Sequence, residues 1–566
     1  MATQPLVATA IEATGGSRSR SVAVSSTVLV PVGLALLTLL TRLPLGGRYL
    51  FNWDALQFAL GVQRFDLAAH RPHPPGYIGY ILLGRLGGMV AGGDVNTALV
   101  LLSAAAEALT VVGIYLVARR LLGEFAGLAA ALLLLTSPLY WFYGETALTY
   151  GLEPGLSLAG FWLAWRAVDR GRGLAAAAVA VAAAGALRPS SEVFMLPMLL
   201  VAAWLILRRH GPRARREVAV ASLALVATTA AWLAPLLWLS GGAEAYLRAS
   251  LQLGSRVSGG SAVWSAGLGG LRLNVAAVLA GAADALGVFV AMALAAVVVS
   301  RLGPTRAAAA RARWPVEGRL VILVAAWALP ALAVYSLVHI GQLAYVLFAL
   351  PAALLLAGPV LDRLAAVVSD GRERLRNRAR GGLLAACVLA NAVAFLAPHA
   401  LASETRDRDV HVQALLAEVR RHDPARTLLL ADPEGPGSYR LAQYYLPGYA
   451  AVAVGRDSHG RAGEMFADHG GAPEYDLARF SESGPLRLPA MTQALVIDQR
   501  VVDSVADRSR LHEVKLGPGA EGSVYTVDVD PADPPVAWRD GLFLRGSDCP
   551  CQGWAPPPPR PLMAPL

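Results

Sequence analysis

Charged residues are scarce in this 566-residue chain: they make up 16% of it, against 55% hydrophobic residues, and the mean hydropathy is +0.49. This balance excludes an ordinary soluble globular protein, in which about 25% of the residues are charged. Only three cysteines are present, which excludes a disulfide framework. Cys549 and Cys551 could form a strained disulfide or a weak metal site, or remain two ordinary thiols.

Motifs for metals and nucleotides are also missing. The sequence has no HExxH, no convincing DxD, no paired CxxC and no P-loop. We therefore predict no metal and no cofactor. The net charge of +9 does not indicate nucleic-acid binding, because the arginines lie in short loops between apolar segments.

Long apolar runs dominate the sequence instead. About eleven runs have spanning or near-spanning length. They lie at 22–40, 97–118, 124–141, 152–168, 173–187, 191–207, 217–239, 274–300, 320–338, 343–361 and 382–398. Arginines cluster in alternate loops, so the positive-inside rule predicts a cytoplasmic N-terminal tail (1–21) and an extracytoplasmic C-terminal part. Residues 22–398 would form the transmembrane domain, with a large first outer loop at 41–96.

The C-terminal part, 399–566, has a different character. The segment "VHVQALLAEVRRHD" has helical spacing, and the segments "TLLLAD", "YAAVAVG", "QALVIDQ", "HEVKLG" and "GSVYTVDV" predict short strands. We therefore expect a small extracytoplasmic α/β domain, followed by an extended proline-rich tail, "WAPPPPRPLMAPL".

The first outer loop carries unusual chemistry in "NWDALQFALGVQRFDLAAHRPHPPGY". Apolar spacing over 51–65 predicts an amphipathic helix on the outer membrane surface, with Asn52 as its N-cap. One stripe would face lipid or protein, and the other would present Asp54 and Gln57 to a cavity. Prolines stiffen the segment 70–77, and "GYIGYILLGRLGG" could form an interfacial or re-entrant helix. The alternative is a rigid loop with solvated charges.

These motifs resemble the GT-C superfamily of membrane glycosyltransferases, in particular the protein O-mannosyltransferases, the aminoarabinose transferases and related bacterial members. "GALRPSSEVFMLP" and "HIGQLAYVLFALP" fit the same pattern, and the later "LAQYYLPGY" is similar to such proteins. The resemblance covers roughly 22–398 and departs at Ile78, where a proline is often found. It implies a GT-C-like fold, a polyprenyl-phosphate sugar as donor substrate and activity on the extracytoplasmic side of the bacterial plasma membrane.

Inverting transfer from a lipid phosphate needs a general base and cationic groups near the departing phosphate. The resemblance points to Asp54 as the base. Asp66 is the second candidate for a site acid, although it could instead pair with Arg64 or Arg71 or cap a turn. In the second outer loop, Glu145 would help to orient the acceptor, a hydroxyl of a glycan, lipid or protein. Glu153 is the alternative candidate for this role. A simpler interpretation is that Glu145 is only an interfacial acid beside an aromatic belt.

Other polar residues are candidates for the donor site. Arg188 lies on the outer side against the positive-inside trend, so it either binds phosphate or extends to the interface. Arg71 and His73 could contact the sugar or the phosphate. His339, Gln342 and Tyr345 form a polar start to an apolar run, and we assign them to the donor site, although a lone histidine is usually a packed interfacial residue.

Two other classes of function remain. A transporter or flippase would place its key charges near the bilayer midplane. The candidate acids lie at outer ends of spans, which favours the enzyme. A non-catalytic scaffold for the C-terminal domain would leave the residues around Asp54 without a role.

Overall fold

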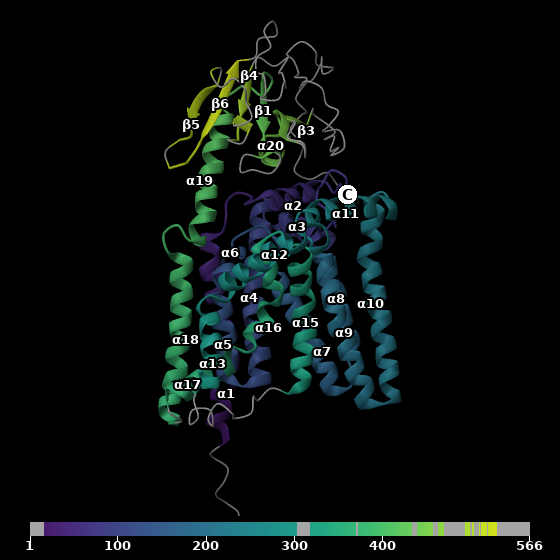
Figure 1. Cartoon of the computed structure of the whole chain (residues 1–566), viewed down its shortest axis with the longest axis vertical. Helices are drawn as coiled ribbons and strands as arrows, with labels where there is room; N and C mark the ends of the chain where they lie inside the picture. Colours follow the sequence, from purple (N-terminus) through teal and green to yellow (C-terminus); the bar gives the residue numbers. More distant parts are fainter. Residues whose placement is uncertain are drawn as a thin grey trace, which may run out of the picture.

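The protein is a tall bundle of helices with a small sheet at one end (Figure 1). The computed structural model describes residues 16–302, 317–369, 372–432, 438–456, 462–468, 493–498, 501–502, 509, 511–517 and 519–528. Seven of the described helices are long and apolar enough to span a membrane, and one bent pair would make an eighth. The prediction of a polytopic α-helical membrane protein with a small C-terminal α/β unit is confirmed, whereas the number of eleven spans is not.

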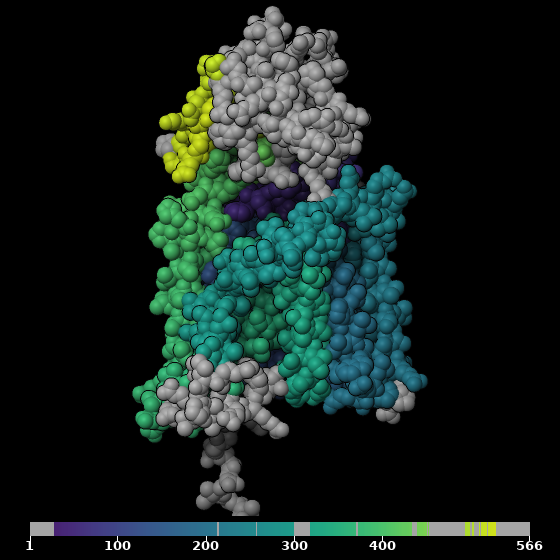
Figure 2. Space-filling model, viewed as in Figure 1, coloured from purple at the N-terminus to yellow at the C-terminus, as the bar shows by residue number. Residues whose placement is uncertain are grey.

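The bundle is built from long helices and shorter connecting ones. The long helices are α1 (Gly16–Arg42), α4 (Val95–Leu122), α5 (Glu124–Leu135), α7 (Glu153–Arg170), α8 (Leu174–Leu187), α9 (Pro189–His210), α10 (Pro212–Leu239), α12 (Val263–Leu286), α13 (Val288–Leu302), α15 (Gly318–Leu337), α17 (Ala357–Val368) and α18 (Glu373–Leu396). The connecting elements are η1 (Leu43–Leu45), α2 (Trp53–Gln63), α3 (Ile78–Val90), α6 (Pro138–Tyr143), η2 (Thr149–Gly151), α11 (Ala243–Gly259), η3 (Leu343–Ala349) and α16 (Leu350–Leu354). In Figure 2, α12 runs obliquely across one face of the bundle, below the first outer loop.

Three predicted spans are interrupted in the structure. The run 124–141 is divided where α5 ends and α6 begins, because Ser137 caps a new helix that has Pro138 in its first turn. The run 274–300 is divided into α12 and α13 by Gly287, whose φ of 54° ends the first helix. The run 343–361 becomes η3, α16 and α17, with a bend of 58° between its two halves.

The first outer loop differs most from its predicted form. Asn52 is the N-cap of α2 as expected, since its side chain accepts a 3.0 Å hydrogen bond from the Ala55 amide. The helix does not lie on the membrane surface, however, because every residue from Ala55 to Val62 is buried. A Cβ added at Gly61 would lie 2.7 Å from the backbone nitrogen of Pro72. The proline-rich segment therefore packs directly on α2, and only a glycine fits at this position.

The C-terminal unit is a six-stranded mixed sheet with the order β3-β2-β1-β4-β6-β5. Its elements are α19 (Leu401–Val419), β1 (Thr427–Ala431), α20 (Tyr439–Tyr445), β2 (Ala450–Arg456), β3 (Ala462–Asp468), β4 (Gln493–Val496), β5 (His512–Lys515) and β6 (Ser523–Asp528). β1 pairs in parallel with β2 and β4, and the outer pairs are antiparallel. All five predicted strands and the predicted helix are present, whereas α20 and β3 were not predicted. The cysteine pair near the C-terminus and the proline-rich tail lie outside the described residues.

Candidate active site

Asp54 lies in the first turn of α2, where its carboxylate faces η3. The Gln342 amide donates a 2.9 Å hydrogen bond from Nε2 to Asp54 Oδ2. The Tyr143 hydroxyl donates a longer bond, 3.4 Å, to Gln342 Oε1. The Asp54 side chain is 23% exposed, so a substrate can reach it. Three segments far apart in the sequence thus meet at one accessible carboxylate.

His73 lies on the other side of Asp54. Its Nδ1 is 3.9 Å from Asp54 Oδ1, and its ring contacts those of Phe58 and Tyr77, with centroids 5.2 and 4.9 Å apart. Burial lowers the pKa of His73 below its ordinary value; the Asp54 carboxylate opposes this, and Arg188 adds to it. The imidazole is therefore neutral at neutral pH, and it can donate a hydrogen bond without adding positive charge.

Arg188 connects α8 to α9 and is buried beneath aromatic rings. Its guanidinium carbon lies 4.5 Å from the ring centroid of Tyr345 and 4.9 Å from that of Tyr150. Nη1 is 3.2 Å from a carboxylate oxygen of Glu153, and Ser191 donates a 2.8 Å bond to the other oxygen. Arg188 therefore forms a buried ion pair with Glu153, a contact that the sequence did not reveal.

Tyrosine rings pack around Arg188 of this ion pair. Tyr345 contacts Tyr150 and Tyr335, with ring centroids 5.9 and 5.1 Å apart, and Tyr143 contacts Tyr150 at 4.9 Å. Burial raises the pKa of Tyr77, so its hydroxyl stays protonated and can donate a hydrogen bond. The sequence assigned a role only to Tyr345. Four more aromatic donors of this cluster were missed, because tyrosines near span ends resemble an ordinary aromatic belt.

His339 borders the same cluster. Its Nδ1 is 3.0 Å from the Ser261 hydroxyl, and burial lowers its pKa. A Cβ added at Gly341 would lie 2.9 Å from the Tyr345 hydroxyl and 3.0 Å from His339 Nε2. The predicted trio His339, Gln342 and Tyr345 is thus compact, but only Gln342 contacts Asp54 directly.

Glu145 belongs to a different cluster. Its carboxyl is fully buried near the ion pair of Arg42 and Glu107, whose atoms are 2.9 Å apart and whose side chains are completely buried. Arg42 also donates a 2.7 Å bond to the Leu135 carbonyl. Burial raises the pKa of Glu145 to about 9; Arg42 opposes this shift, and Glu107 adds to it. Of the two acids considered in the second outer loop, Glu153 and not Glu145 lies beside Arg188.

Asp66 and Arg71 close a short turn. Their backbones exchange two hydrogen bonds, of 2.6 and 2.8 Å, and the Asp66 carboxylate accepts a 3.1 Å bond from the Ala69 amide. Asp66 thus caps a turn, which was one of its predicted alternatives. Among the described residues, no group of three or more His, Cys, Asp or Glu side chains is placed to hold a metal ion.

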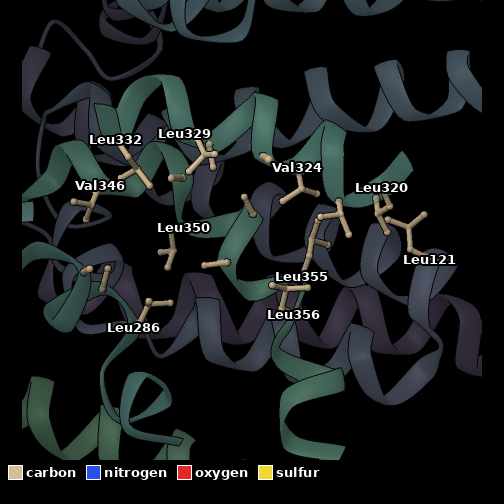
Figure 3. Close-up of a pocket in the computed structure, with 18 of the residues that line it drawn as sticks. Leu121, Leu286, Leu320, Val324, Leu329, Leu332, Val346, Leu350, Leu355 and Leu356 are labelled. Atoms are coloured by element: carbon tan, nitrogen blue, oxygen red, sulfur yellow. The ribbon is translucent and has the colours of Figure 1, made fainter. Parts of the chain in front are cut away.

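An apolar pocket of about 360 Å³ begins next to the cluster of tyrosines around Arg188 (Figure 3). Its lining residues come mainly from α12, α15, η3 and α16. Val346, at one end, directly follows Tyr345, and Leu121 and Leu320 line the other end. Leu320 and Leu332 are twelve residues apart on α15, so the pocket extends roughly 18 Å along that helix.

The chain is similar to known membrane glycosyltransferases. The family model described as dolichyl-phosphate-mannose-protein mannosyltransferase matches residues 73–238. The crystal structure of ArnT from Cupriavidus metallidurans bound to undecaprenyl phosphate has a TM-score of 0.55 at 13% identity, covering 89% of this chain and 98% of that one. The apo state of the same ArnT has a TM-score of 0.51 at 14% identity, with the same coverage. A search of curated protein sequences finds no match.

The family match begins at His73 and runs to the end of α10, so it includes Glu153 and Arg188 but not Asp54. The ArnT likeness extends over nearly the whole chain and shows the same fold. The family match over 73–238 and the ArnT-like fold support the resemblance to the GT-C superfamily of membrane glycosyltransferases that the motifs of the first outer loop indicated.

Proposed function

We propose that this integral membrane protein transfers a sugar from a polyprenyl-phosphate donor to an acceptor hydroxyl, with inversion, on the extracytoplasmic face of the bacterial plasma membrane. The observation that carries the proposal is the position of Asp54. It is an accessible carboxylate held by Gln342, which is three residues before Tyr345 of the aromatic cluster and four before Val346 of the apolar pocket.

Asp54 serves as the general base. It takes the proton of the acceptor hydroxyl while the acceptor oxygen forms a bond to the anomeric carbon. The bond between that carbon and the phosphate oxygen breaks, and polyprenyl phosphate leaves with the bonding electrons. Attack from the side opposite the phosphate inverts the anomeric centre.

Arg188 and the tyrosines receive the departing phosphate. The contacts of Arg188 with Glu153 and Ser190 use Nη1 and Nε, so Nη2 can be presented to an anion. The hydroxyls of Tyr77 and Tyr345, with the neutral imidazole of His73, add hydrogen-bond donors that carry no charge. This arrangement suits a phosphate whose negative charge increases as the sugar departs.

The apolar pocket accommodates the first part of the polyprenyl chain. Its lining is almost entirely leucine, valine and alanine. There the chain exchanges its contacts with bilayer lipid for dispersion contacts with these apolar side chains, and no polar group is desolvated. The ArnT structure with undecaprenyl phosphate supports a lipid phosphate of this kind as the donor.

The test uses the full-length protein in proteoliposomes. Undecaprenyl phosphate carrying radiolabelled sugars is supplied together with a bacterial envelope fraction as acceptor. We expect label in the acceptor and an equal amount of free undecaprenyl phosphate, and transfer slower by roughly a hundredfold or more with Asp54→Asn. Movement of the intact donor across the vesicle, without release of undecaprenyl phosphate, would instead support a flippase.

A further inference from the structure

The C-terminal domain contacts the first outer loop through α20, the helix that contains most of "YRLAQYYLPGY". Figure 1 shows α20 between the sheet and α2, and the two helices pack against each other. The proposed function gives this domain no role. Its contacts with the loop are too specific for a simple tether, and they centre on Arg440.

Arg440 is completely buried, although it carries a full positive charge. Its Nη2 donates a 2.7 Å hydrogen bond to the carbonyl of Ala69, in the first outer loop. Its guanidinium carbon lies 5.4 Å from the ring centroid of Trp53, the residue before Asp54. Within α20, Nη1 donates a 2.6 Å bond to Gln443. A planar guanidinium can stack on a ring and donate in its plane at once, which a lysine cannot do.

A second set of contacts holds the chain just before α2. The Tyr445 hydroxyl, on α20, accepts a 2.9 Å hydrogen bond from the Leu50 amide. Asp409, on α19, accepts bonds of 2.8 and 3.0 Å from the amides of Arg48 and Tyr49. The C-terminal domain therefore contacts the first outer loop both before α2 and after it.

We propose that Arg440 is a positioning residue for Asp54, and that the C-terminal domain uses it to set the geometry of the first outer loop. The proposal rests on the proposed function. Asp54 follows Trp53, so a shift of the Trp53 ring moves the carboxylate relative to Gln342 and the acceptor. A displacement of about 1 Å at a reacting group can lower the rate roughly a hundredfold. The donor contacts are assigned to Arg188, Tyr77, Tyr345 and the pocket, whereas the Arg440 contacts given above are to Trp53, Ala69 and Gln443.

The test compares Arg440→Met, Arg440→Lys and Arg421→Met in proteoliposomes. Arg421 is the matched control, because it lies in the same domain, forms an ion pair with Glu418 and has a side chain that is 72% exposed. We expect Arg440→Met to lower kcat by roughly 10- to 100-fold, with the donor KM changed less than about twofold. Arg440→Lys should recover part of kcat, since it can still donate to the Ala69 carbonyl, and Arg421→Met should behave like the unmodified protein.

A purely structural role for Arg440 would give a different pattern. It would reduce the amount of folded protein and leave kcat per donor-binding site unchanged, and that result would overturn the proposal. If Arg440→Met does not fold, Tyr445→Phe provides the test, because it removes only the hydroxyl that accepts from the Leu50 amide. An unchanged kcat in Tyr445→Phe would also overturn the proposal. Absence of transfer by the unmodified protein would instead contradict the proposed function itself.

Discussion

The side-chain amide of Gln342 donates a 2.9 Å hydrogen bond to the carboxylate of Asp54, although 288 residues separate them. Oε1 of the same Gln342 side chain accepts a hydrogen bond from the Tyr143 hydroxyl, and this contact fixes the orientation of the amide. Asp54 Oδ2 is thereby occupied, while Oδ1 faces His73 at 3.9 Å. Oδ1 is thus the atom best placed to receive the proton of an acceptor.

Gln342→Leu should lower kcat by roughly tenfold, because Asp54 loses the donor that orients it. The donor KM should change little, since the contact is to the proposed base, Asp54, and not to the phosphate. Transfer is measured in proteoliposomes over a range of donor concentrations that reaches saturation. Gln252→Leu, at an exposed position on α11, is the control and should leave both constants unchanged. A loss of donor affinity without a change in kcat would assign Gln342 to the donor instead.

Asp54→Asn and Asp66→Asn distinguish the two acids of the first outer loop. Asparagine at 54 cannot accept the proton, so kcat should fall by roughly a hundredfold or more. Asparagine at 66 can still accept from the Ala69 amide as a cap, so transfer should stay close to normal. Both variants should fold, as judged by yield and size-exclusion profile. The opposite ranking of the two rates would make Asp66 the base.

The sequence predicted much of the site one residue at a time, but not the pairings. Local rules were sufficient to predict Asn52 as an N-cap and the five strands. They were also sufficient to select Asp54 and Gln342 as candidate site residues. They could not show that α2 is covered on all sides, because the covering residues lie in α3, α20 and the proline-rich segment. An amphipathic pattern shows which residues can be buried, and it does not show how many neighbours will bury them.

Buried ion pairs were the main omission. Glu107 lies 65 residues from Arg42 and Glu153 lies 35 residues from Arg188, so no local spacing connects the partners. The sequence analysis explained Arg188 either by a bound phosphate or by extension to the interface, and it did not foresee Glu153 as a partner. The sequence analysis grouped Glu145 with Asp54 because both follow predicted outer ends of spans. In the structure, Glu145 lies near Arg42 instead.

Arg188→Met should be strongly destabilising, because it leaves Glu153 as an unpaired buried charge, a change that costs about 3–5 kcal/mol. The double variant Arg188→Met/Glu153→Gln should recover most of the stability, since it removes both charges. It should not recover transfer, because the donor's phosphate still lacks its cation. Thermal unfolding and binding of undecaprenyl phosphate measure the two effects separately. Normal donor binding by the double variant would remove Arg188 from the phosphate site.

Val324→Trp should fill the apolar pocket, which Val324 lines. The KM for an undecaprenyl-phosphate donor should rise roughly tenfold, while that for a farnesyl-phosphate donor should change little, because the shorter chain needs less of the pocket. Leu200→Trp is the matched control, at a position on α9 that is 70% exposed. Equal effects on both donors would mean that the chain binds elsewhere.

Glu145→Gln tests whether this acid is catalytic. Burial raises the pKa of Glu145 to about 9, so the folded protein holds a proton there that the unfolded chain releases above its ordinary value near 4.5. Between these two pH values the folded state binds more protons than the unfolded state, so stability must fall as the pH rises. Glutamine is neutral at every pH and has nearly the same shape, so the variant should lack this part of the pH dependence.

The expected result is a melting temperature for Glu145→Gln that exceeds that of the unmodified protein by a margin growing from about pH 5 to pH 9. Transfer at pH 7 should stay within about twofold, because Glu145 lies with Arg42 and Glu107 and not with Asp54. Thermal unfolding at several pH values, with transfer assayed on the same samples, makes the comparison. A large loss of transfer at unchanged stability would return Glu145 to the catalytic machinery, and a margin that shrinks with pH would show that its carboxyl is charged in the folded protein.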